Sequence, residues 1–186
     1  QFTTSVDLGY RTAWGGGSLY AAGYHRIVDA TITRIATQAP GSPLLYNVFQ
    51  NAGRSRITGS ELVWQQTVSP AVSLSANANL YRTTIGAFTV VNRYPVPVTY
   101  SAERTSLTSG SFKVNANIRL PGAWETRLSS IYLAPDLFPQ GRIGSRYSLD
   151  VGVRKSVQGG RGELVANATD LLNTMQIRRT INGTDF

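Results

Sequence analysis

Residues 72–81 read Val-Ser-Leu-Ser-Ala-Asn-Ala-Asn-Leu-Tyr, a strict alternation of apolar and polar side chains. Residues 112–120 repeat this alternation as Phe-Lys-Val-Asn-Ala-Asn-Ile-Arg-Leu. A period of two predicts a β-strand with one apolar and one polar face. Strands of roughly ten residues are long enough to cross a bilayer at a tilt, whereas soluble sheets more often use about five or six residues per strand. The two stretches therefore predict strands of a transmembrane β-barrel, with lipid outside and water inside.

The composition is compatible with this class and excludes several others. The chain has 186 residues, a mean hydropathy of −0.13 and no apolar run long enough for a transmembrane helix. Barrels share this pattern because only alternate strand residues face lipid. Cysteine is absent and His25 is the single histidine, which excludes disulfide scaffolds and cysteine or multi-histidine metal sites. The net charge of +8 comes from scattered basic residues, which favours a basic lumen or loop surface over nucleic-acid binding.

Eight strands are expected, and the linkers between them alternate between short and long. The expected strands occupy residues 3–14, 18–35, 54–68, 71–83, 106–120, 123–133, 146–156 and 162–169. The long linkers span residues 36–53, 84–105 and 134–145, and the short ones are rich in Gly and Pro. Outer-membrane barrels show this asymmetry, with tight periplasmic turns and long extracellular loops. The sequence therefore predicts an all-β, antiparallel, up-and-down transmembrane β-barrel in the bacterial outer membrane.

The linkers also orient the strands. With the short turns in the periplasm, the first strand runs inward and the eighth runs outward, whereas a complete bacterial barrel begins and ends in the periplasm. We therefore expect residues 1–186 to form one partial outer-membrane barrel domain, with about eight strands of a larger barrel and without a plug domain. A terminal Phe is usual in such barrels, but Phe186 follows a polar stretch and is interpreted as a coincidence.

The two faces of the expected strands suggest separate roles. The apolar face carries aromatic residues near strand ends, which indicates interfacial girdles, although ordinary core aromatics are the alternative. The candidate interfacial aromatics are Trp14, Trp64 and Trp124 near short turns, and Tyr132 and Tyr147 near long loops. The polar face forms a lumen wall that needs water or a plug, and its candidate charges are Lys113, Arg119, Glu125, Arg127, Asp150, Arg154 and Glu163. Opposite charges on neighbouring strands predict three cross-strand pairs, namely Arg119–Glu125, Arg127–Asp150 and Arg154–Glu163.

Signatures of catalysis are absent from the sequence. It contains no Gly-x-Ser-x-Gly elbow, no phosphate-binding loop and no His-Glu-x-x-His motif. We therefore predict that the chain is not an enzyme, and we expect no catalytic residues, no metal ligands and no cofactor. The long loops are the expected capture surfaces for a ligand, with candidate contacts at Tyr46, Arg93, Tyr94, Tyr100 and Arg142. The alternative is that these side chains only order the loops.

Several stretches resemble a known family. Residues 51–62 read Asn-Ala-Gly-Arg-Ser-Arg-Ile-Thr-Gly-Ser-Glu-Leu, which is similar to an Asn-x-Gly-x-Ser-x-x-x-Gly-x-Glu pattern before a long strand in TonB-dependent receptors. Residues 74–82, 147–155 and 168–174 also fit that family, the last with Leu172 where the family usually has Phe. In order and spacing, these stretches resemble the C-terminal β-barrel portion of a TonB-dependent outer-membrane receptor of the Bacteroidetes type, an outer membrane protein beta-barrel family.

The resemblance implies a function as well as a fold. It implies a barrel of about 22 strands plugged by an N-terminal domain, which takes up a scarce large solute. The implied partners are the lipid bilayer, the rest of the barrel with its plug domain, and a TonB-type energy-transducing complex reached through the missing N-terminal part. No nucleic acid is expected. Two alternatives remain, namely a passive outer-membrane barrel such as a porin or adhesin, and a soluble β-rich binding module.

Overall fold

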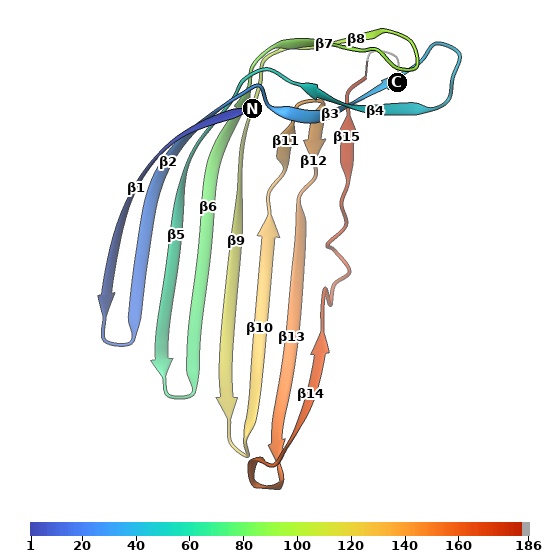
Figure 1. Cartoon of the computed structure of the whole chain (residues 1–186). Helices are drawn as coiled ribbons and strands as arrows, with labels where there is room; N and C mark the ends of the chain where they lie inside the picture. Colours follow the sequence, from blue (N-terminus) through green and yellow to red (C-terminus); the bar gives the residue numbers. More distant parts are fainter. Residues whose placement is uncertain (184–186) are drawn as a thin grey trace.

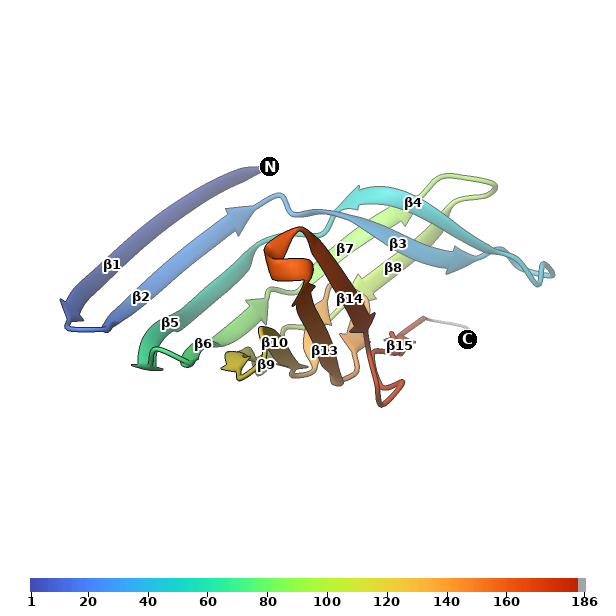
Figure 2. The ribbon, with the colours of Figure 1, turned by 90° about the horizontal axis from the view of Figure 1, so that it is seen from below.

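Eight long antiparallel strands form one open, curved sheet (Figures 1 and 2). The computed structural model describes residues 1–183, so the interpretation of Phe186 lies outside the described residues. In sheet order the strands are β1 (Phe2–Trp14), β2 (Gly17–Asp29), β5 (Ser55–Ser69), β6 (Val72–Ile85), β9 (Thr105–Leu120), β10 (Trp124–Leu133), β13 (Arg146–Val157) and β14 (Gly162–Ala168). Each strand pairs with its neighbours in this order, which is the up-and-down topology predicted from the sequence.

The register of the sheet separates two chemically different faces. Between β6 and β9, Leu74 lies opposite Ala116 and Ser75 lies opposite Asn115. Apolar residues therefore gather on the outer face and polar residues on the concave face, as the alternation predicted. Large apolar side chains on the outer face are open to the surroundings, with Leu8 81% and Leu80 61% exposed. Such a face is stable in lipid but costly in water.

Short turns join the strand pairs at one end of the sheet, and all long connections lie at the other end (Figure 1). The short turns use left-handed backbone where the chain reverses, with φ of 83° at Gly16 and 77° at Gly122. Glycine adopts this conformation without a steric cost, which explains its presence in these tight connections. The predicted alternation of short and long linkers is therefore confirmed.

One expected strand is wrong in its outer half. The sequence predicted a single strand over residues 18–35, but β2 ends at Asp29 and a separate strand, β3 (Ile32–Gln38), begins after a break. Ala30 has a φ of 52°, which turns the chain out of the sheet. Thr31 then donates its N–H to the carbonyl of Gly53 and accepts the N–H of Ala52, so the chain is drawn into a different hairpin.

The residues expected as three long loops form hairpins of their own. β3 pairs with β4 (Leu45–Asn51), β7 (Phe88–Asn92) pairs with β8 (Val98–Ala102), and β11 (Asp136–Phe138) pairs with β12 (Gly141–Ile143), which also pairs with β15 (Arg179–Ile181). We call these seven short strands the hairpin cap. In Figure 1, β3, β4, β7 and β8 lie across the outer end of the long strands and nearly perpendicular to them.

The hydrophobic core of the described residues lies in the hairpin cap and where the cap meets the outer end of β6. Its buried members are Ile35, Ala52, Ile85, Phe88, Val90 and Tyr100. Ile85 belongs to the long strand β6 and follows the parity of its concave face. The cap therefore docks on the concave side of the sheet. Within residues 1–183 no helix is long and apolar enough to cross a membrane.

Candidate functional site: the lumen wall and the hairpin cap

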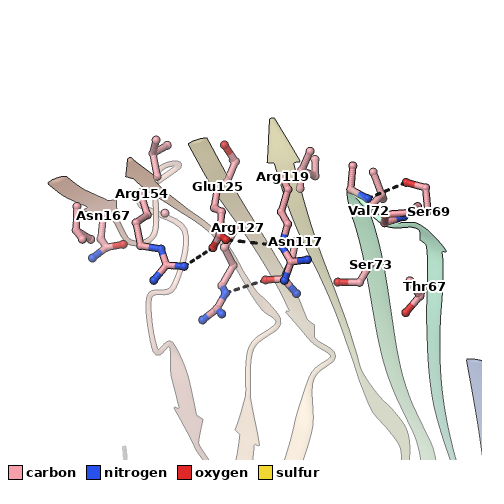
Figure 3. Close-up of a pocket in the computed structure, with 17 residues that line it drawn as sticks. Thr67, Ser69, Val72, Ser73, Asn117, Arg119, Glu125, Arg127, Arg154 and Asn167 are labelled. Carbon is pink, nitrogen blue, oxygen red and sulfur yellow. Dashed lines mark hydrogen bonds and ion pairs between the residues drawn. The ribbon is translucent and has the colours of Figure 1, made fainter. Parts of the chain in front are cut away.

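The lumen wall is the concave face of the long strands, and charged side chains gather there near the short turns. They border a recess of about 580 Å³, shown in Figure 3. In that view Arg119, Glu125 and Arg154 project side by side from β9, β10 and β13. Cross-strand register brings them together, because Arg119 lies opposite Glu125 and Glu125 lies opposite Arg154.

A network of ion pairs runs across the lumen wall. The Arg154 guanidinium contacts Glu125 at 2.6 Å and Glu163 at 3.1 Å. The Nε of Arg119 lies 3.6 Å from the other oxygen of Glu125. The predicted pairs Arg119–Glu125 and Arg154–Glu163 are therefore confirmed, and Glu125 links them into one chain of charges. These side chains are between 42% and 72% exposed, so solvent screens them and they add little to stability. The network fixes these charged groups relative to one another on the concave face.

The third predicted pair, Arg127–Asp150, is wrong. Arg127 lies opposite Gly152 and Asp150 lies opposite Ser129, so the two side chains are two residues out of register. Arg127 instead donates from Nε to the side-chain oxygen of Asn117 at 2.9 Å.

Asp150 has different partners, both close to the chain segment that follows β14. Its carboxylate accepts the Ser148 hydroxyl at 2.8 Å and the backbone N–H of Asp170 at 2.8 Å. Asp150 therefore anchors the chain after the last long strand. Lys113 occupies the same concave face, opposite Asn77 on β6 and Ile131 on β10.

The candidate interfacial aromatics all follow the parity of the outer face. Trp14 ends β1, where its Nε1 donates to Gln66 at 2.8 Å, and Trp124 begins β10, where the ammonium of Lys155 lies 4.4 Å from the ring. Trp64 lies further from its short turn, within β5. At the opposite end, Tyr132 of β10 lies directly across from Tyr147 of β13. This placement is compatible with two aromatic girdles, a role that stays a prediction.

The candidate ligand contacts are distributed over the hairpin cap. Tyr46 and Tyr94 meet edge to face, with ring centroids 5.9 Å apart, and Tyr94 is 68% exposed. Arg93 and Arg142 are also exposed. Tyr100 is placed differently from the expectation, because it is buried against Phe88 in the core of the cap. Burial raises the pKa of its phenol above the ordinary value.

Three amide side chains that were not predicted from the sequence hold the hairpins of the cap together, and two of them, Gln140 and Asn92, are buried. Gln140 is 2% exposed and forms two hydrogen bonds with the backbone of Ala36, accepting its N–H at 2.7 Å and donating to its carbonyl at 2.5 Å. The Gln140 side chain thus takes the place of a neighbouring strand at the edge of β3. We call Gln140, Asn92 and Gln50 the amide lock.

Asn92 is the centre of the amide lock. It is fully buried, and its amide donates to the carbonyl of Ile35 at 3.1 Å and to the hydroxyl of Thr37 at 2.9 Å. Its side-chain oxygen accepts the amide of Gln50 at 2.7 Å. Buried amides that are satisfied in this way fix one arrangement of the strands, because any other arrangement leaves polar groups without partners.

A second recess, of about 360 Å³, lies between the lumen wall and the hairpin cap. Tyr24, Arg26 and Tyr81 reach it from the long strands, and Asp136 reaches it from β11. Tyr24 donates its hydroxyl to Asn79 at 2.8 Å, which fixes the ring in the wall. These residues were not among the candidates predicted from the sequence. Their polar parity was visible, but the meeting with Asp136 depends on how the last hairpin folds back.

The described residues offer no ready site for a metal ion. Among residues 1–183, no three His, Asp or Glu side chains come together in the way that metal binding requires. His25 follows the outer parity and its Nδ1 lies 2.7 Å from the Thr58 hydroxyl. It therefore lies on the opposite side of the sheet from the two recesses.

The chain forms the wall of a transmembrane β-barrel. Three features define this class: an exposed apolar outer face, a polar concave face and short turns confined to one end of the strands. The family model of the Outer membrane protein beta-barrel family matches residues 1–186, and the chain belongs to this family. Its location is therefore the bacterial outer membrane. No curated protein and no solved structure matches the chain.

Proposed function

We propose that this barrel domain belongs to a TonB-dependent receptor that takes up a scarce large solute. The observation that carries the proposal is the hairpin cap, which has its own core and docks on the concave side of the outer end. Diffusion through a passive pore does not depend on such an ordered structure at its outer end. A receptor needs one, because capture of a scarce solute requires a surface that is already ordered before binding.

The lumen wall supplies the second part of the proposed mechanism. Glu125 and Arg154 are fixed in one network, yet both keep exposed polar atoms that face the lumen. A plug domain of matching charge binds such a wall through many weak, hydrated contacts, which a pulling force breaks one after another. In the proposed cycle, the cap captures the solute, the recess beneath it receives the solute, and the energy-transducing complex then displaces the plug.

The proposal also assigns partners to the open edges of the sheet. Within residues 1–183, β1 pairs only with β2 and β14 pairs only with β13. Each edge thus exposes backbone N–H and carbonyl groups that lipid cannot satisfy. We propose that further strands of the same barrel pair with both edges and close the wall around the plug.

A cross-linking experiment on the full-length protein in its membrane tests this function. A photoreactive residue replaces Asn117 on the lumen wall and, as a matched control, Ala116 on the lipid-facing side of the same strand. We expect the probe at position 117 to cross-link to an N-terminal plug domain and the probe at 116 to cross-link to lipid alone. The purified full-length protein should also show no steady ion conductance in a planar bilayer.

The opposite results would identify a different class of protein. Steady conductance, together with no protein cross-link from position 117, would assign the chain to a passive porin and overturn the proposal. A chain that stays monodisperse without detergent would be a soluble module, which the proposal excludes.

A further inference from the structure

Four arginines form a cluster on the outer face of the sheet, at the end away from the short turns. Arg56 lies opposite Thr84 and Arg82 lies opposite both Thr58 and Thr108, so these side chains share the parity of the outward-facing leucines. We call the set the outer arginine cluster, and its members are Arg54, Arg56, Arg82 and Arg104. All four are exposed. They lie on the opposite face from the lumen wall, so a solute inside the barrel does not meet them.

The cluster lies at the upper boundary of the apolar band. Along the outer face of β6, Leu80 is the last apolar residue and Arg82 is the next outward position. Arg82 is about ten residues from the start of β6, which at about 3.3 Å per residue and a tilt of about 40° is roughly 25 Å of height. That height matches the apolar band of a barrel, so Arg82 reaches the lipid headgroups. Arg56 and Arg104 are further from their short turns and lie above the band.

Three of the four arginines border a shallow recess, and the cluster carries a net positive charge. The recess has a volume of about 190 Å³, and Arg54, Arg56 and Arg104 line it together with Thr84. Arg54 is ion-paired with Asp29. In the described part of the chain, the other three arginines form no ion pair with a carboxylate. Guanidinium groups that converge without a protein counter-charge attract an anion, and their planar N–H donors fit phosphate oxygens.

A separate apolar groove lies nearer the short turns on the same membrane-facing surface. The groove has a volume of about 650 Å³, and its floor is made of the small residues Ala21, Gly23, Ser60 and Ala78. Leucine side chains rise on both flanks, at Leu8 and Leu80. On the outer face of β5, Ser60 of the groove and Arg56 of the cluster are separated by one outward-facing residue, Thr58, which contacts His25. The groove thus lies below the arginines on the same strand.

We propose that the outer arginine cluster binds the phosphate headgroup of an outer-leaflet lipid, one of whose acyl chains lies in the groove below. Three features of the surface select this occupant. The charge matches a phosphate, the height matches the headgroup layer, and the groove offers apolar contact below the cluster. A free anion would use only the first of these features. The lipid bound there would hold β5, β6 and β9 together at the level where the hairpin cap begins.

Lipid binding to the full-length protein in a neutral detergent tests the proposal. Native mass spectrometry measures the binding of diphosphoryl lipid A and of a galactolipid with similar acyl chains but no phosphate. The variant Arg56→Gln/Arg82→Gln should weaken lipid A binding at least tenfold and leave galactolipid binding unchanged. The matched control, Arg11→Gln/Arg161→Gln, removes the same charge from the lumen wall and a short turn, and should leave lipid A binding unchanged.

A groove variant distinguishes a lipid from a free anion. At Gly23, an added Cβ would meet no atom closer than 4.0 Å, so Gly23→Leu fills the groove without disturbing the sheet. It should weaken lipid A binding while leaving the binding of inorganic phosphate unchanged. The proposal is overturned if the cluster variant binds lipid A normally, or if the control variant weakens binding equally. It is also overturned if inorganic phosphate competes with lipid A at equal concentration.

Discussion

Gln140 is a position at which the structure predicts a large effect for loss of a polar side chain. Replacement by Met keeps the length of the side chain and fills the same volume, but it removes both hydrogen bonds to Ala36. Ala36 is 2% exposed, so water cannot replace the lost partners while the cap stays closed. The substitution therefore leaves one N–H and one carbonyl buried without partners.

The expected cost follows from those two groups. A buried backbone group without a partner costs about 1–3 kcal/mol, so the two groups left by Gln140→Met should favour local opening of the cap by about 2–6 kcal/mol. Because about 1.4 kcal/mol corresponds to a factor of ten, hydrogen exchange at the amides of β3 should accelerate roughly 30- to 20,000-fold. The long strands should keep their protection, since their ladders do not include Gln140.

Hydrogen exchange read by mass spectrometry on the detergent-solubilised protein measures this effect peptide by peptide. Asn47→Met is the matched control, because Asn47 lies opposite Ala36 in the same hairpin but is exposed. The control should change exchange in β3 by less than threefold. If Gln140→Met leaves hydrogen exchange in β3 unchanged, or if both variants accelerate it equally, then the amide lock does not hold the cap together.

Two further predictions concern the membrane-facing surface and the core of the cap. Ala76→Arg places a charge halfway along the lipid-facing side of β6 and should cost about 2–4 kcal/mol in denaturant unfolding from vesicles. Asn77→Arg, on the lumen side, should cost close to nothing, and equal costs would contradict the assignment of the two faces. The raised pKa of buried Tyr100 predicts that the cap is fully stable below pH about 10 and loses stability as the pH rises through that pKa. Near-UV circular dichroism should show this loss, and Tyr100→Phe should abolish it; a transition that persists in Tyr100→Phe would refute the assignment.

The large sheet was predictable because each of its long strands tends to alternate apolar and polar residues along its own sequence. Alternation in residues 72–81 and 112–120 depends only on which side of the strand meets lipid, so each strand carries the signal by itself. Seven of the eight expected strands match the observed ones within two residues at each end. The exception, residues 18–35, ends early because Ala30 leaves the sheet in response to contacts with residues 52–53, more than twenty positions away.

The hairpin cap was not predictable, because its contacts join residues that are far apart in the sequence. The contact of Gln140 with Ala36 spans 104 residues of sequence. The contact of Asn92 with Ile35 spans 57 residues. No local sequence pattern predicts contacts over such separations. A buried Gln or Asn in a loop looks like an ordinary polar surface residue in the sequence. The charged pairs of the lumen wall were predictable only in part. The Arg119–Glu125 pair was predictable because a tight turn fixes which residues of β9 and β10 lie opposite each other. The prediction of an Arg127–Asp150 pair was wrong because it required the exact register between β10 and β13.

For the proposed receptor function, the location of the core would let the barrel keep its wall while its solute changes. The long strands have lipid on one side and the lumen on the other, so their stability comes from backbone ladders and lipid contact. The buried core lies in the cap and at its contact with β6. Along a cap strand, buried residues of this core alternate with exposed residues. On β7, Phe88, Val90 and Asn92 are buried, whereas Thr89 and Val91 are exposed. Substitution of the exposed residues alters what the cap presents to a solute and leaves the core intact. Recognition can thus diverge in the cap without any compensating change in the wall.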